Sequence, residues 1–154
     1  MSKVVGRMCV AFFVFALSVT AAAAAGIDLK SIQSAGLTKD QAKEVLVLAL
    51  KHDKYNLSKR GVFIDGDLKD ANGNPAHPGY YDFSLGYDSP KSGATEYMGL
   101  FSVSVLTGDV WETNTCKRLG SRALKRLQTV ISHKTTKTFA DEKDARRGLG
   151  CTDE

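Results

Sequence analysis

Apolar and polar residues alternate between residues 80 and 112 with the two-residue period that is typical of half-buried β-strands. Tyr81, Phe83 and Leu85 are apolar positions of the first strand, and a loop rich in Ser, Pro and Gly follows at 88–93. Farther along, a Thr-Gly-Asp sequence turns the chain between two more apolar runs. The pattern predicts an antiparallel meander of three strands, near 80–87, 95–106 and 109–113.

A helix with one apolar face is predicted before this meander. Thr38 and Gln41 form a T-x-x-Q capping box, which predicts a helix that begins at Lys39 and ends near Lys54. Between the helix and the meander, the apolar run at 62–64 predicts a short strand at one edge of the sheet. The helix has apolar residues at the spacing of a single face that can cover the sheet: Ala42, Val45, Leu46, Ala49 and Leu50.

Two further helices are predicted after the meander. Residues 113–115 offer cap residues for a second helix, whose apolar face would run from Cys116 to Ile131. A shorter third helix is predicted over 139–147, ended by Gly148. This order of elements indicates the α+β class, with a small antiparallel sheet of three to four strands packed by an N-terminal helix and a C-terminal helix.

The first 25 residues predict a cleaved signal peptide. Lys3 and Arg7 precede an apolar run at 9–19, and small residues then suit cleavage before Gly26. The run is shorter than the roughly 20 residues of a membrane-spanning helix, although an uncleaved anchor is the alternative interpretation. Cleavage would leave a single domain at 26–154 and lower the formal charge from +4 to +2. We therefore expect a periplasmic protein without stable membrane insertion and without a nucleic-acid partner.

Two cysteines, Cys116 and Cys151, remain after the predicted cleavage. In an oxidising compartment a lone pair of cysteines is most simply explained as a disulfide. A reactive thiol at Cys116 is the alternative, but the sequence shows no neighbouring His that would activate it. The sequence therefore predicts a disulfide between these two residues.

The segment 65–79 predicts a long polar loop that is rich in Asp, Asn, Gly and Pro. It fails the EF-hand pattern, because Lys69 or Pro75 would stand where a calcium ligand or the turn glycine is required. Local Asx turns account for its acidic residues, and a non-standard calcium site is the alternative. The three histidines lack the spacing of a zinc site, and only His77, in this loop, is placed to contact a partner. We predict no metal ion and no other cofactor.

The sequence contains no Ser in a nucleophile elbow and no glycine-rich phosphate loop, so we predict that the protein is not an enzyme. Its charge distribution is more informative. Residues 65–112 carry eight acidic residues against two lysines, whereas residues 117–147 carry ten basic residues against three acidic ones. Such a dipole can steer a charged partner. The alternative interpretation of the basic half is a helix face that is simply solvated.

Two resemblances to known families add to this interpretation. Residues 101–111, with the sequence FSVSVLTGDVW, resemble the hairpin of PepSY-type domains, which implies an accessory role outside the cytoplasm. The wider arrangement resembles periplasmic immunity proteins of the type VI secretion amidase class. It combines the signal peptide, the capped helix, the YYDFSLGYD and TGDVWE strands, and the two cysteines. This second resemblance implies that the protein binds a peptidoglycan-cleaving amidase from a sister cell and blocks its substrate cleft.

We therefore predict a periplasmic immunity protein whose partner is a secreted toxin, expected to be a cell-wall amidase. The alternative is a PepSY-like or cystatin-like module that binds a ligand in the cell envelope. The sequence also leaves a homodimer open. The loops at 65–79 and 88–93 are the expected contact surface, because acidic loops can pair with basic residues around a cleft and Tyr is a common interface anchor. The predicted contact residues are Asp67, Asp70, His77, Tyr80 and Asp88.

Overall fold

The computed structural model describes residues 26–66 and 68–151, so the predicted signal peptide and Asp67 lie outside the described residues. Within the described chain, a five-stranded antiparallel sheet is flanked by helices, and its strands lie side by side in sequence order. The elements are α1 (Lys39–His52), β1 (Val62–Gly66), β2 (Tyr80–Asp88), β3 (Thr95–Ser104), β4 (Val110–Glu112), β5 (Lys117–Leu119), α2 (Arg122–Thr135) and α3 (Glu142–Gly148).

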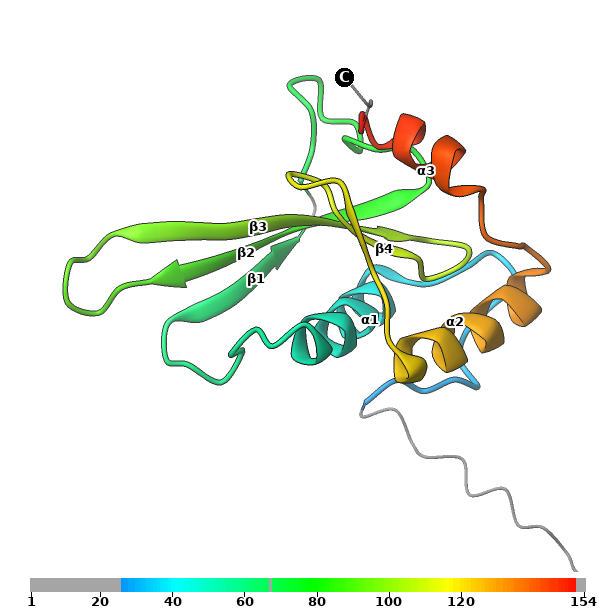
Figure 1. Ribbon diagram of the computed structural model, residues 1–154, viewed down its shortest axis with the longest axis horizontal. Coiled ribbons are helices and arrows are strands. Elements are labelled where there is room, and N and C mark those ends of the chain that lie inside the picture. Colours follow the sequence, from blue (N-terminus) through cyan, green and yellow to red (C-terminus); the bar gives the residue numbers. More distant parts are fainter. Residues whose placement is uncertain (1–25, 67, 152–154) are drawn as a thin grey trace, which may run out of the picture.

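The predicted α+β class is confirmed, with five strands in place of three to four. Helices α1 and α2 lie on one side of the sheet, whereas α3 and the segment before β2 lie on the other side (Figure 1). The apolar run at 62–64 belongs to β1, which forms an edge of the sheet as predicted. The long β2–β3 hairpin extends beyond all three helices (Figure 1).

Helix α1 begins where its capping box predicts. The Thr38 hydroxyl accepts a hydrogen bond from the backbone N–H of Gln41 at 3.3 Å, and the Gln41 side chain accepts one from the N–H of Thr38 at 2.9 Å. Because both bonds satisfy orphan donors of the first turn, the helix start is defined locally. The apolar face of α1 then packs on the sheet and on α2, in a core that includes Leu46, Leu50, Phe83, Leu85, Phe101, Val103, Val110, Leu124 and Ile131.

The predicted start of the second helix is wrong. The chain turns after Glu112 through Cys116, whose φ is +53°, and residues 117–119 return to pair with β4 as strand β5. Helix α2 begins only at Arg122, where the Ser121 hydroxyl accepts a hydrogen bond from the N–H of Leu124 at 3.0 Å. Strand pairing with β4 thus overrides the helical spacing of apolar residues in this segment.

Two other boundaries also differ from the predictions. Strand β3 ends at Ser104, because the N–H of Gly108 bonds the Ser104 carbonyl and Gly108 turns the chain at a φ of +66°. Helix α3 begins at Glu142 with Asp141 as its N-cap, not at residue 139. Gly148 lies inside this helix, and Gly150 is the glycine that takes the positive φ after it.

Candidate functional site

The sheet has an outer face, which we define as the face that points away from α1. Phe83 and Leu85 of β2 pack in the core with α1, so Asp82, Ser84 and Gly86 point to the outer face by alternation. At the end near β4, the outer face is covered by α3. Toward the tip of the β2–β3 hairpin, no element of the described chain lies over it (Figure 1).

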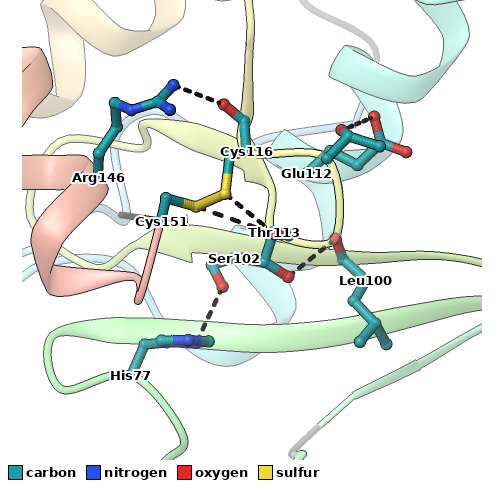
Figure 2. Close-up of a disulfide and its surroundings, with 9 residues drawn as sticks. His77, Leu100, Ser102, Glu112, Thr113, Cys116, Arg146 and Cys151 are labelled. Carbon is teal, nitrogen blue, oxygen red and sulfur yellow. Dashed lines mark hydrogen bonds between the residues drawn. A yellow bond between two sulfur atoms is a disulfide. The ribbon is translucent and has the colours of Figure 1, made fainter. Parts of the chain in front are cut away.

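The predicted disulfide holds the covered end of this face together. Cys116 and Cys151 are bonded, with their Cα atoms 5.5 Å apart, and they join the turn after β4 to the chain just beyond α3. The Arg146 guanidinium donates a hydrogen bond to the Cys116 carbonyl at 3.2 Å (Figure 2). Trp111 is fully buried beneath this layer, in a cluster with Ala145, Leu149 and Cys151.

Asp109 is a buried acid beside this cluster. One carboxylate oxygen accepts a hydrogen bond from the Trp111 indole N–H at 2.9 Å, and the other accepts one from Nε of Arg118 at 2.8 Å. The Arg118 guanidinium also lies 5.1 Å from the centre of the Phe139 ring. Both oxygens of Asp109 are therefore engaged in hydrogen bonds, which offset the cost of burying a carboxylate. This group supports the structure and is not free for chemistry.

The predicted contact residue His77 belongs to a second buried polar cluster. Its ring Nδ1 lies 2.8 Å from Asp82, and its backbone N–H donates to the same carboxylate at 3.1 Å. The Ser102 hydroxyl lies 3.3 Å from His77 Nδ1 (Figure 2). The same hydroxyl donates a hydrogen bond to Asp82. These contacts fasten the end of the segment before β2 to the outer face of the sheet.

This grouping of Ser, His and Asp does not have the geometry of a catalytic triad. In a triad, Ser and Asp contact different ring nitrogens, so that the imidazole relays a proton between them. Here both Ser102 and Asp82 approach Nδ1 of His77, and the Ser102 hydroxyl donates its hydrogen bond directly to Asp82. Ser102 is 1 % exposed, which leaves a substrate no access to its hydroxyl. The cluster therefore positions a loop.

Asp70, another predicted contact residue, forms a local turn. One of its carboxylate oxygens accepts hydrogen bonds from the backbone N–H groups of Asn72 at 2.9 Å and Asn74 at 2.8 Å. These bonds, that of Asn74 first, hold the pKa of Asp70 below its usual value of 3.8. The described residues contain no group of three or more His, Cys, Asp or Glu side chains that could hold a metal ion. The Asp70 side chain therefore stabilises a local Asx turn, as the loop composition indicates.

The structure places Tyr80 and Asp88 at opposite ends of β2. Eight residue steps at about 3.3 Å each separate them by about 26 Å. Tyr80 is half-buried against the Trp111 cluster, and burial together with the nearby Asp109 charge raises the pKa of its hydroxyl above 10.0. Asp88 is exposed at the hairpin end, where it accepts a hydrogen bond from Thr95 at 2.6 Å. The two predicted loops therefore do not form one cluster.

Three apolar residues that the sequence analysis did not select lie between these two loops. Among the described residues, the exposed large apolar side chains are Tyr97, at 74 %, and Met98 and Leu100, at 41 % each. All three lie on β3. The available signal was the presence of apolar residues in both phases of the strand pattern, since Leu100 precedes the buried Phe101 directly. A strand with one solvated face alternates instead.

The basic half of the chain forms a shallow recess at the start of α2. It is lined by Gly120, Ser121, Arg122, Lys125, Arg126 and Thr129. An adjoining recess includes Arg118 and Phe139. Ser121 is engaged as the helix cap and Arg118 as the partner of Asp109, so these two recess residues have structural roles.

Taken together, these surfaces provide apolar and acidic contact area without a catalytic grouping in the described chain. The family described as "T6SS, Immunity protein Tgi2PP" matches residues 36–143. The chain belongs to the Tgi2PP family of type VI secretion immunity proteins. A solved structure of a type VI secretion system effector-immunity complex from Pseudomonas protegens contains a similar chain, with 60 % identity and a TM-score of 0.75. The match covers 81 % of this chain and 98 % of that chain, and no curated protein matches.

Membership of the Tgi2PP family confirms the predicted type VI secretion immunity protein over the PepSY-like or cystatin-like alternative. The partner class is accordingly a type VI effector. None of the helices in the described ranges is long and apolar enough to cross a membrane. The choice of contact residues by the sequence analysis stays a prediction, and Asp67 lies outside the described residues.

Proposed function

We propose that this immunity protein acts in the periplasm, where it binds a cell-wall-degrading type VI effector and blocks the effector's substrate cleft. The observation that carries the proposal is membership of the Tgi2PP immunity family over residues 36–143. The complex from Pseudomonas protegens supports direct binding, because it pairs an effector with an immunity protein. In this proposal the protein neutralises its partner by occupancy and has no catalytic activity of its own.

The disulfide and the N-terminal sequence support the periplasmic location. Cys116 and Cys151 are bonded in the structure, and disulfides persist in oxidising compartments such as the periplasm. The first 25 residues have the composition of an export signal. A cell-wall effector also acts outside the cytoplasm, so its inhibitor has to be exported to meet it.

A protection assay tests both parts of this proposal. Cells that lack the gene would export the effector encoded beside it, and viable cells would be counted with and without the full-length protein. We expect survival with the full-length protein, none with a variant that lacks residues 1–25, and survival again when that variant carries an unrelated export signal. Equal protection by the leaderless variant would overturn the periplasmic location, and no protection by any variant would overturn the immunity function.

The resemblance of the sequence to immunity proteins of the amidase class implies that the effector is an amidase, and the reaction products test this directly. An amidase releases free peptides from purified peptidoglycan, whereas a glycosidase releases sugars that still carry their peptides. Mass spectrometry of the fragments distinguishes the two. In either case, an equimolar amount of the immunity protein should abolish release, because a blocked cleft admits no glycan strand.

A further inference from the structure

We propose that the effector is held by one apolar patch on the outer face of the β2–β3 hairpin, with Tyr97 as its central anchor. This inference rests on the proposed function and identifies the binding surface. The patch, which we call the hairpin patch, consists of Phe63, Tyr97, Met98 and Leu100. It is bordered by exposed acidic side chains, so its partner is a protein surface with an apolar socket and a basic rim.

Strand pairing places the members of the hairpin patch on one face. Gly86 of β2 pairs with Phe63 on one side and with Tyr97 on the other, so these three residues form a row across three strands. Gly86 has no side chain, and the Phe63 ring occupies the space where a Cβ atom would lie. Leu100 pairs with Ser84 two positions along the same face. The row therefore places Phe63 and Tyr97 on either side of a glycine, on one face of the sheet.

An irregularity in the sheet adds Met98 to this patch. Leu85 pairs with Gly99 and Gly86 pairs with Tyr97, so Met98 is an extra residue on β3 without a partner on β2. Such a bulge bends the strand and redirects its side chains, and bulges are frequent near functional sites. Met is also a side chain that adapts to an irregular partner surface.

Apolar side chains are covered at one end of the outer face and exposed at the other. At one end the chain covers Trp111 with α3 and fastens this cover with a disulfide. At the other end Tyr97 is left 74 % exposed on a sheet face where a polar residue would be the usual choice. A cluster of apolar side chains that the protein's own elements leave uncovered indicates a surface that binds another protein.

The surroundings of the patch indicate the charge of the partner. Asp65 and Asp88 are exposed and share the outer face with Ser84 and Gly86 by pairing and alternation. Glu96 and Lys59, in contrast, lie with Tyr87 on the opposite face, and Lys91 lies in the connecting turn. A small recess of about 90 Å³ adjoins Leu100 and is bordered by Leu68, His77 and Thr113. It extends the apolar surface toward the segment that His77 fastens to the sheet. The patch thus lies between both loops that the sequence analysis expected to make contact.

The inference is tested by measuring affinity for the effector used in the protection assay. The variants replace residues on either face of the β2–β3 hairpin. Tyr97→Ser and Leu100→Thr remove patch side chains. Tyr87→Ser is the control, because Tyr87 lies on the same hairpin but on the opposite face, beneath Lys59. We expect Tyr97→Ser to weaken binding by about 30-fold or more, as at interface hot spots, and Tyr87→Ser to change it by less than about threefold.

Three results would overturn the inference while leaving the immunity function intact. One is wild-type affinity in both patch variants together with loss of binding in Asp70→Asn or Asp88→Asn. Another is a wild-type dimer that Tyr97→Ser converts to monomers without any change in affinity, since the patch would then serve self-association. The third is equal loss in Tyr97→Ser and Tyr87→Ser at unchanged circular dichroism. Failure of the wild-type protein to bind would instead count against the proposed function.

Discussion

Nδ1 of His77 lies 2.8 Å from a carboxylate oxygen of Asp82, which is only 5 % exposed. The same carboxylate accepts hydrogen bonds from the His77 backbone and from the Ser102 hydroxyl. One buried acid thus fastens the segment before β2 to the middle of the sheet. Because buried polar groups are costly when they lose their partners, we expect this side chain to hold the end of the segment in place.

Replacement of Asp82 by Ala should therefore destabilise the protein. The His77 N–H and the Ser102 hydroxyl would both lose their acceptor, and we expect a cost of about 2–4 kcal/mol in the free energy of unfolding. Urea denaturation measures this cost, and hydrogen exchange at residues 77–80 reports the loosening of the segment. Asp65→Ala is the matched control, since Asp65 is an exposed acid on β1. An equal, small effect of both substitutions would contradict the role assigned to Asp82.

Loss of the disulfide should free α3 and expose Trp111. Cys116 and Cys151 are 35 residues apart, and a loop of this size corresponds to about 4 kcal/mol in the chain-entropy model. The chain contains a single Trp, which is fully buried under α3. Reduction, or a double Cys→Ser variant, should therefore lower stability and shift the tryptophan emission to longer wavelength. Emission that stays unchanged in the folded, reduced protein would show that α3 remains in place without the covalent bond.

Local features of the sequence predicted the structure better than features that depend on distant partners. The capping box of Thr38 and Gln41 lies within four residues, and α1 begins where it indicates. The segment after Cys116 has a helical period, yet its pairing with β4 produces β5, and the sequence shows no sign of this pairing. The same limit applies to the loop before β2, because His77 and Ser102 are 25 residues apart and meet only in the folded sheet.

The hairpin patch was missed for a related physical reason. Tyr97 has the chemistry of a core residue, and periodicity alone does not tell which face of a sheet the helices cover. The bulge at Met98 then shifts the alternation, so the phase found at Phe101 does not continue to Tyr97. Exposure could be assigned only after the positions of α1 and α3 were known.

Alkaline pH should destabilise the protein through two tyrosines. Burial raises the pKa of Tyr55, with a further contribution from Glu112, and burial also raises the pKa of Tyr80. A raised folded-state pKa means that the folded protein binds more protons than the unfolded one. The resulting stability is fully present below pH 10.0, the usual tyrosine value, and is lost as the pH rises through the folded-state values.

A double Tyr55→Phe, Tyr80→Phe variant isolates this contribution. The free energy of unfolding should fall less steeply above pH 10.0 in the variant than in the wild type. Lys117, whose pKa is raised by its hydrogen bond with Asp53, changes stability in the same direction, so the comparison with the variant is necessary. Denaturation curves across the alkaline range provide the measurement. Parallel slopes for the two proteins would refute the contribution of the tyrosines.

Two glycines of the β2–β3 hairpin should respond differently to substitution by Ala. A Cβ atom at Gly86 would meet the Phe63 ring, which is half-buried at the outer face and can move aside. A Cβ atom at Gly99 would come within 2.8 Å of the Phe101 ring, which is 1 % exposed in the core. Gly99→Ala therefore overpacks the core and should cost about 1–3 kcal/mol of stability.

Gly86→Ala should instead affect binding. Displacement of Phe63 would disturb the row that it forms with Tyr97, so we expect about tenfold weaker effector binding with a stability change below about 1 kcal/mol. Gly99→Ala is the converse control, because it should leave the affinity of the folded protein nearly unchanged. In a double-mutant cycle, Phe63→Ala and Gly86→Ala should be non-additive, since the glycine substitution acts through the Phe63 ring. Additive effects on affinity would mean that Gly86→Ala does not act through the Phe63 ring.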